Sequence, residues 1–197
     1  MELRGDYVLL RPMTLRERQL FYRWATSSDA TPFWYGELYG DEVPSYVVFK
    51  HEWPNYYFDG SQLNKGRAFL IMLDQTRIGQ INYNEIEERD HSVELDILIA
   101  EEKYYGRGYG TDAIRTLTSY LFREMKVRRC RIEVVSKNPR AIRAYEKAGF
   151  KHVYTYSRKG IIWHVMEHIN HHFDHQAFKL VHSQRKASSE IHSKNSR

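Results

Sequence analysis

The stretch from Val93 to Met125 places the strongest constraint on how this chain folds. It opens with the apolar run 95–100, which is short and rich in branched side chains and therefore predicts a buried strand. A glycine-rich segment, 106–110, follows, and apolar residues then recur every three or four positions, as they do in an amphipathic helix. The sequence thus predicts a strand, a glycine-rich turn and a helix in immediate succession.

This succession is typical of a phosphate-binding site. Glycine lets a ligand approach the backbone closely, and the first N–H groups of a helix, at the positive end of its dipole, attract an anion. A P-loop is excluded because that motif ends in Gly-Lys-Ser/Thr, whereas here Thr111 follows Gly110 directly and the lysine is missing. A Rossmann fingerprint is excluded because Gly106, Gly108 and Gly110 do not have its spacing. From the glycines alone, a tight turn with a helix cap remains an alternative.

A second segment, 138–150, reads as one complete short helix. Asn138 is a good N-cap, Pro139 falls at the first helical position where its missing N–H costs nothing, and Gly149 is a typical stop. The branched run 130–136 before it predicts another strand.

Together these segments resemble two motifs of the GNAT superfamily of N-acetyltransferases: the acyl-CoA loop, Q/R-x-x-G-x-G/A, and the later N-x-x-A-x-x-x-Y-x-x-x-G-F. Tyr105 stands where the loop usually has Gln or Arg, although related branches often have an aromatic residue there. The resemblance spans about residues 3–168 and rests on 94–150. It is closest in look to the aminoglycoside 6′-N-acetyltransferases and the ribosomal-protein N-acetyltransferases.

The resemblance implies an α/β (α+β) GNAT fold, with a central mixed, mostly antiparallel twisted sheet of about seven strands and about four helices. The sheet is expected to be splayed between the fourth and fifth strands. The patterns predict strands at 7–11, 67–74, 77–85, 91–100, 130–136, 150–157 and 160–168. They predict helices at 14–25, between Pro44 and Pro54, after the glycine turn and at 138–149.

We expect one acetyltransferase domain, 1–168, and a tail, 169–197, rich in His, Lys and Ser that is mobile or loosely docked. The tail histidines His171, His172 and His175 could be read as metal ligands, but no cysteine joins them and we expect no metal site. Ten aromatic residues lie between 33 and 58, of which Phe49, Trp53 and Phe58 are expected in the core. The acidic loop 85–90 is expected to be solvated, or else to attract a polycation.

Charge and cysteine content narrow the function classes. The net charge is +5, of which the tail carries +3 and the rest only +2, so no basic stripe suggests nucleic-acid binding. The single cysteine, Cys130, favours a reducing compartment. Because the sequence has no leader-like apolar segment and no long apolar run, we expect a cytoplasmic protein with no membrane partner. We expect it to be a monomer or a homodimer.

The resemblance implies acetyl-CoA as co-substrate and no metal. It implies that the backbone of Leu98, Ile99 and Ala100 pairs with the pantetheine arm, which Asn138 also touches. It implies that main-chain N–H groups of one run bind the pyrophosphate: Arg107, Gly108, Tyr109, Gly110 and Thr111.

Acetyl transfer needs a neutral amine, and an alkyl ammonium of pKa ~10.4 costs about 4.6 kcal/mol to deprotonate at pH 7. Asp96 falls on the aspartate that is held to be the acid/base in aminoglycoside 6′-N-acetyltransferases, and strand alternation puts it on one face with Glu94 and Leu98. Asp96 could instead dock the ammonium, or be a carboxylate paired structurally. Tyr145 matches the family tyrosine beside the thioester sulfur, where it can protonate the thiolate, and its alternative is packing.

The segment 33–37 resembles the aromatic-Gly stretch of aminoglycoside 6′-N-acetyltransferases, which implies that Trp34, Tyr35 and Glu37 contact the acceptor together with Asp96. Rings beside an acid suit a cationic amine or a sugar. The expected acceptor is a small cationic amine such as an aminoglycoside. The alternatives are a polyamine, a hydroxylysine-type siderophore precursor, the N-terminus of a ribosomal protein, or a CoA-binding sensor without turnover.

Overall fold

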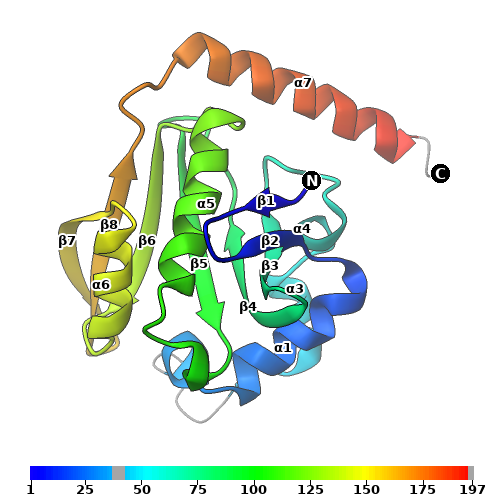
Figure 1. Ribbon diagram of the computed structural model, residues 1–197. Helices are drawn as coiled ribbons and strands as arrows, with labels where there is room; N and C mark the ends of the chain where they lie inside the picture. Colours follow the sequence, from blue (N-terminus) through cyan, green and yellow to red (C-terminus); the bar gives the residue numbers. More distant parts are fainter. Residues whose placement is uncertain (37–42, 195–197) are drawn as a thin grey trace.

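The structure is a computed structural model that describes residues 1–36 and 43–194, with side-chain surroundings up to residue 184. The described strands form one mixed sheet in the order β1-β2-β3-β4-β5-β6-β8-β7 (Figure 1). The strands are β1 (Leu3–Arg4), β2 (Leu9–Pro12), β3 (Arg67–Leu73), β4 (Thr76–Tyr83), β5 (Ser92–Ile99), β6 (Arg129–Val135), β7 (Lys151–Arg158) and β8 (Ile161–Ile169). The α-helices are α1 (Arg18–Ser27), α3 (Tyr46–Glu52), α4 (Tyr56–Asp59), α5 (Tyr109–Arg123), α6 (Pro139–Lys147) and α7 (His175–Lys194). Short turns of 3-10 helix at Leu15–Glu17 and Glu102–Tyr104, and a π-helical turn at Pro32–Gly36, complete the described elements.

The predicted local signals account for several element ends. The predicted capping box forms at the 3-10 turn Leu15–Glu17 that leads into α1, since the Glu17 carboxylate accepts a hydrogen bond from Thr14 N at 2.9 Å. At α6 the Asn138 side chain accepts from Ala141 N at 3.1 Å, and the helix stops before Gly149, whose φ is +99°.

The sheet is splayed where the sequence predicted, between the fourth and fifth expected strands, which are β5 and β6. These two strands run parallel and pair over only three residues of each, from Ser92 to Glu94 on β5 and from Arg129 to Arg131 on β6. All other neighbouring strands are antiparallel. Beyond Glu94 the two strands part, and this opening positions the site.

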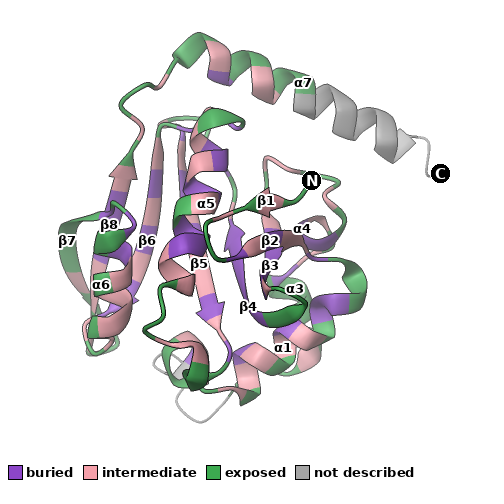
Figure 2. Ribbon diagram, in the orientation of Figure 1, coloured by how far each residue is buried: buried purple, intermediate pink, exposed green. Residues whose placement is uncertain are grey.

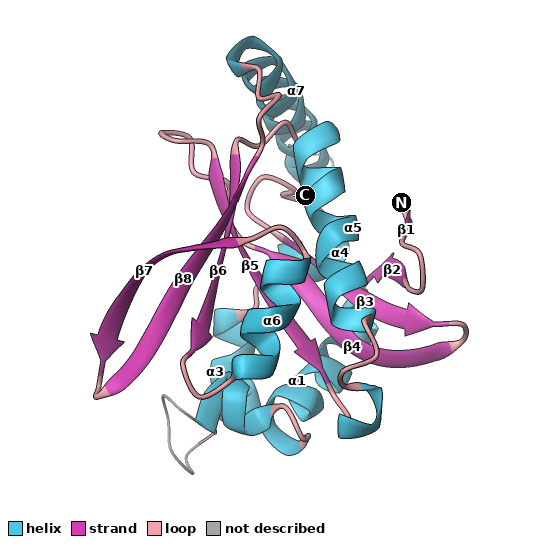
Figure 3. Ribbon diagram, turned by 60° about the vertical axis from the view of Figure 1, so that its left-hand side comes forward, coloured by secondary structure: helices cyan, strands magenta, loops and turns pink. Residues whose placement is uncertain are grey.

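Helices cover both faces of the sheet (Figure 3). One face packs against α5 and α6 through a cluster that includes Leu95, Ile132 and Leu117. The other face, over β2 to β5, packs against α1, α3 and α4 through a second cluster that includes Leu98 and Phe21. The predicted core residues Phe49, Trp53 and Phe58 belong to this second cluster. Figure 2 shows that burial concentrates on β3 to β6, whereas β7 is exposed along most of its length.

The first strand differs from the prediction. The expected strand 7–11 is β2, which begins only at Leu9, and the unpredicted β1 precedes it. The reason is Asp112 on α5, whose carboxylate accepts hydrogen bonds from Asp6 N at 3.0 Å, Tyr7 N at 2.8 Å and Val8 N at 2.9 Å. These three N–H groups therefore bind a side chain of a helix instead of a neighbouring strand. With β1 included, the sheet has eight strands instead of the expected seven or so.

In the tail, residues 175–194 form α7, a helix that the sequence patterns did not predict (Figure 1). Two aromatic side chains attach its beginning to the body: Phe173 and Phe178 pack on the ring of His91, with centroids 5.1 and 3.8 Å away. The sequence analysis did not predict this contact because histidine and polar residues surround Phe173 and Phe178 in the sequence. The described helices include none that combines the length and apolar character needed to cross a membrane.

Gly79 on β4 is required by the close approach of β5. A Cβ built on Gly79 lies 2.1 Å from the Leu98 carbonyl oxygen, and a backbone atom cannot move aside cheaply. We therefore expect Gly79→Ala to lower the free energy of unfolding by about 1–3 kcal/mol, measured by urea denaturation. Gly110→Ala is the matched control, since its Cβ would meet nothing nearer than 3.8 Å. Equal stability of the two variants would contradict this assignment.

Candidate active site

A cleft of about 560 Å³ opens where β5 and β6 part. Its walls come from β5, the glycine turn, the start of α5, β6 and α6. Residues from both faces of the sheet line it, for example Asp96 from one face of β5 and Leu95 from the other. The cleft therefore reaches through the gap between the two strands and can admit two reactants from opposite sides.

The glycine turn leaves room for a ligand at the start of α5. Gly106 and Gly108 have φ values of +71° and +88°, and a Cβ on either would meet nothing within 4 Å. Gly108 is the N-cap of α5, so the first N–H groups of that helix have no partner within it. The turn thus offers backbone donors at an open surface, as a phosphate group requires.

Basic side chains of α6 line the same cleft. The Arg140 guanidinium lies over the ring of Tyr105, 3.7 Å from its centroid, and the Tyr105 hydroxyl donates a hydrogen bond to the Ile99 carbonyl at 3.1 Å. Arg143 and Lys147 follow on the same helix. Sequence reasoning missed these three residues, although their positions within the predicted helix, on either side of Tyr145, could have indicated them.

The structure brings most of the predicted cofactor residues to this cleft. Its lining includes Leu98, Ile99, Gly108, Tyr109, Gly110, Thr111, Asn138 and Tyr145. Arg107 and Ala100 are not among the lining residues, and Ala100 is buried in the second cluster. The Asn138 side chain caps α6, and the Thr111 hydroxyl donates to the Ala144 carbonyl at 3.3 Å, which ties α5 to α6.

Asp96 lies in the cleft, held by two amides. Its Oδ2 accepts hydrogen bonds from Asn82 Nδ2 and Asn84 Nδ2, both at 3.0 Å, and the Tyr57 hydroxyl donates to Asn84 Oδ1 at 2.9 Å. Burial raises the pKa of Asp96 above its usual range, the two amides oppose that shift, and Glu133 adds to it. The carboxyl group is thus fixed in position and has a greater proton affinity than an ordinary aspartate. Asn82 and Asn84 were not predicted, but they alternate along the predicted strand 77–85.

Tyr145 is 7% exposed and lines the cleft from α6. Burial, and next the charge of Asp96, raise the pKa of its hydroxyl well above the usual range. The hydroxyl therefore keeps its proton at neutral pH and can donate it.

Two further carboxyl groups line the cleft near Asp96. Glu94 precedes it on the same face of β5, and Glu133 comes from β6, where it accepts a hydrogen bond from the Tyr156 hydroxyl. Sequence reasoning placed Glu94 beside Asp96 but gave it no role, and it missed Glu133. The alternation of Glu133 with Ile132 and Val134 would have indicated that it faces away from the core.

A smaller cavity of about 310 Å³ adjoins the cleft at Asp96. Trp34 lines both cavities, and Tyr35 lines the smaller one, where its hydroxyl donates to Glu52 at 2.8 Å. Burial raises the pKa of Tyr35, and Glu52 adds to the shift. The predicted Glu37 lies outside the described residues. Glu52 was not predicted and supplies a carboxylate in this cavity.

The described residues contain no group of three or more His, Cys, Asp or Glu side chains that could hold a metal ion. His164 on β8 forms a hydrogen bond of 3.0 Å with Ser136. The histidines in the described part of the tail belong to no such group.

Comparison with known proteins identifies the family. A family model described as an acetyltransferase (GNAT) domain matches residues 8–151, and the chain belongs to this family. Over 158 residues it is 30% identical to an aminoglycoside N(6′)-acetyltransferase type 1 from Klebsiella pneumoniae, and the match covers 75% of each protein. It is 24% identical over 143 residues to a spermidine N(1)-acetyltransferase from Escherichia coli K12, with 73% of this chain and 72% of the relative covered.

Structural comparison agrees with the family assignment. The aminoglycoside acetyltransferase AAC(6′)-Ib, solved in complex with ribostamycin and coenzyme A, matches 88% of this chain and 97% of its own, with a TM-score of 0.68 and 27% identity. The protein is thus an acyltransferase of the GNAT class, an N-acetyltransferase with acetyl-CoA as co-substrate. The open glycine turn and the basic residues of α6 fit this polyanionic molecule.

The glycine turn yields a direct test. Gly108→Val places a branched side chain at the start of α5 and strains a backbone with positive φ by about 1–2 kcal/mol. We expect acetyl-CoA affinity, measured by calorimetry, to fall about tenfold or more, equivalent to at least ~1.4 kcal/mol. Gly160→Val is the control, because Gly160 also has positive φ and open space but lies in the β7–β8 turn. Equal affinity losses in both variants would show that strain alone is responsible.

Proposed function

We propose that this enzyme acetylates a primary amine of a small polycationic acceptor of the aminoglycoside type. The observation that carries the proposal is the distribution of charge in the cleft. Carboxyl groups of Glu94, Asp96 and Glu133 lie on one face of the sheet, together with the basic side chain of Arg158 from β7, and the basic side chains of α6 lie over the other face. A polyanionic acetyl donor suits the basic side, and a polycationic acceptor suits the acidic one.

The smaller cavity supports the same acceptor class. It combines the rings of Trp34, Tyr35 and Trp53 with the carboxylate of Glu52, and Asp96 forms its border with the cleft. Flat rings pack against the apolar faces of sugar rings, and they attract ammonium groups through cation–π contacts. The similarity to an aminoglycoside N(6′)-acetyltransferase over 75% of the chain agrees with such an acceptor.

In the proposed reaction Asp96 accepts a proton from the acceptor ammonium. The neutral nitrogen then attacks the thioester carbonyl of acetyl-CoA, and the C–S bond breaks. Tyr145 donates its proton to the departing thiolate, which has a pKa of about 8.5. The nitrogen loses its second proton, which restores the Tyr145 hydroxyl by way of solvent, and Asp96 releases the first proton to solvent. The raised proton affinity of Asp96 reduces the cost of about 4.6 kcal/mol for deprotonating an alkyl ammonium at pH 7.

The assay that tests this function is thiol release from acetyl-CoA with kanamycin, spermidine, a hydroxylysine analogue or an N-terminal peptide as acceptor. We expect the highest kcat/KM with kanamycin. A preference for spermidine would instead favour the polyamine alternative, which the similarity to a spermidine N(1)-acetyltransferase supports. Acetyl-CoA binding without transfer to any amine would contradict the proposal.

Asp96→Asn keeps the shape of the side chain and removes its basicity. We expect kcat to fall roughly 100- to 10,000-fold while acetyl-CoA affinity stays unchanged. A loss of acetyl-CoA affinity equal to that of Gly108→Val would rule out the role given to Asp96.

The pH dependence of kcat gives a second test of Asp96. Its pKa is raised, and the basic form, present above that pKa, is the active one. Activity should therefore decline as pH falls, with a midpoint above the ~3.9 of an ordinary aspartate. This decline should be absent in Asp96→Asn. A wild-type kcat that is constant down to pH 4 would contradict the assignment.

Tyr145→Phe removes only the hydroxyl. If Tyr145 protonates the leaving thiolate, kcat should fall about 100-fold, at the lower end for general acid catalysis, with little change in the acceptor KM. An unchanged kcat would identify Tyr145 as a packing residue.

A further inference from the structure

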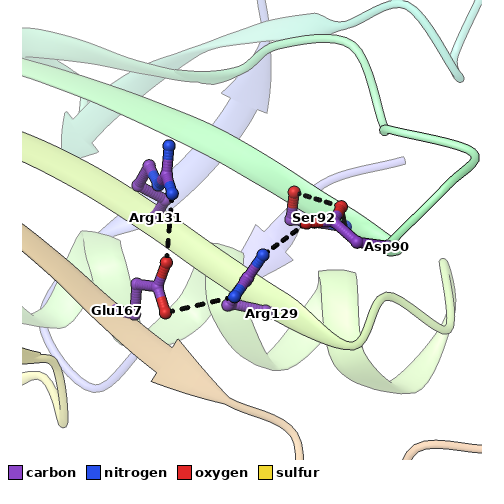
Figure 4. Close-up of polar contacts among 5 residues, drawn as sticks. All are labelled: Asp90, Ser92, Arg129, Arg131 and Glu167. Atoms are coloured by element: carbon purple, nitrogen blue, oxygen red, sulfur yellow. Dashed lines mark hydrogen bonds and ion pairs between the residues drawn. The ribbon is translucent and has the colours of Figure 1, made fainter. Parts of the chain in front are cut away.

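The open face of the sheet beside the cleft carries a row of paired charges (Figure 4). Arg131 Nη2 lies 3.3 Å from Glu167 Oε1, Arg129 Nη1 lies 3.4 Å from Glu167 Oε2, and Arg129 also bonds to Asp90. Asp90 in turn accepts from the Ser92 hydroxyl at 2.7 Å. Arg129 and Arg131 lie on β6, Glu167 lies on β8 and Asp90 lies in the turn before β5. Each charge in the row has an opposite charge beside it.

Glu94 lies next to this row without joining it. Glu94 on β5 is in register with Arg131 on β6, but the Arg131 guanidinium points to Glu167 on β8 (Figure 4). Among the described residues, none gives the Glu94 carboxylate a hydrogen bond or an ion pair. The two other carboxyl groups of the cleft differ, because amides hold Asp96 and the Tyr156 hydroxyl donates to Glu133.

An unpaired carboxylate that is half-buried in a cleft is costly in free energy unless a ligand pairs with it. Arg158 on β7 lines the same cleft and acts on Tyr156. The ionisable groups that act on Glu94 itself are Asp96 on β5, Glu133 and Arg131 on β6, and Tyr156 on β7. Two of these are acidic and Tyr156 is neutral. Arg131, the single cation among them, is already bound to Glu167. The environment therefore favours a positive charge supplied from outside the chain.

We propose that Glu94 binds a second cationic group of the acceptor, next to the amine that reacts at Asp96, and that acceptor binding releases the Glu94 proton to solvent. The proposal rests on the proposed function and makes it more specific. Side chains at i and i+2 of one strand are about 7 Å apart, so the acceptor should carry two cationic groups at about that separation. Glu94 is thus a specificity-determining residue of the acceptor site.

The direction of the pH effect follows from the state of Glu94 before binding. Burial, followed by Asp96 and Glu133, raises the pKa of Glu94 to about 7, and Arg131 lowers it. The carboxylate form, which attracts the cation, therefore becomes populated as pH rises through about 7. Between pH 6 and pH 8 its population rises about tenfold, and acceptor affinity should rise by about the same factor.

Calorimetric titration of the full chain with kanamycin, in the presence of coenzyme A, tests the proposal. Titrations at pH 6, 7 and 8 in buffers of different ionisation enthalpy give both the affinity and the number of protons released. The variant Glu94→Gln should bind kanamycin about tenfold more weakly at pH 8 and release about half a proton less at pH 7. Glu2→Gln, which removes the same charge at an exposed terminal site, should match the wild type.

A second pair of probes separates recognition from a general effect on the cleft. We would compare 1,4-diaminobutane with 4-aminobutanol, in which a hydroxyl replaces one ammonium. Glu94→Gln should weaken binding of the diamine and leave the aminoalcohol unchanged, with coenzyme A affinity unaltered. Equal losses for both probes, or unchanged proton release with kanamycin, would overturn the role of Glu94. A wild-type chain that binds coenzyme A but neither kanamycin nor the diamine would overturn the proposed function as well.

Discussion

The site depends on how briefly β5 pairs with β6. Their parallel ladder covers three residues of each strand, and the ion pairs of Asp90, Arg129, Arg131 and Glu167 lie at that joined end. Beyond it, β6 pairs only with β8, so residues 97–99 of β5 have no strand on that side. An extended ligand can add to such a strand edge through main-chain hydrogen bonds. The pantetheine arm of acetyl-CoA is an extended chain with amide groups, and we propose that it pairs with this edge.

Strand alternation then sorts the chemistry into two faces. Leu95 of β5 packs with the α5 and α6 cluster, and Leu98 packs with the α1, α3 and α4 cluster. Asp96, which shares the Leu98 face, therefore points away from the helix that carries Tyr145 and the basic residues. Because the sheet is open at this point, groups on its two faces reach one cleft. One reactant can enter from each side and meet the other between the strands.

The sequence predicted the parts of this arrangement that are encoded locally. The strand, the glycine turn and α5, and the capped helix α6, follow from short-range signals such as Pro139 and Gly149, and these elements carry most of the predicted site. The missed features depend on distant contacts. Asp112 holds the N-terminal segment across more than one hundred positions of sequence, and Phe178 anchors α7 on His91. The partners of Asp96, Asn82 and Asn84, become apparent only when β4 lies beside β5. The same holds for Glu52, which meets Tyr35 through tertiary packing.

Two carboxyl groups on one face of β5 are suited to different tasks because their partners differ. Asp96 is fixed by two amide donors, and a proton acceptor in catalysis must be held within hydrogen-bond reach of its substrate. Glu94 has no such donors among the described residues, which leaves its carboxyl group available for the second cationic group that we propose it binds. The electrostatic cost of placing two acids together falls when a polycation binds, since each ammonium stabilises the ionised form of the acid it meets. The proposed polycationic acceptor therefore relieves this cost more fully than an acceptor with a single charge.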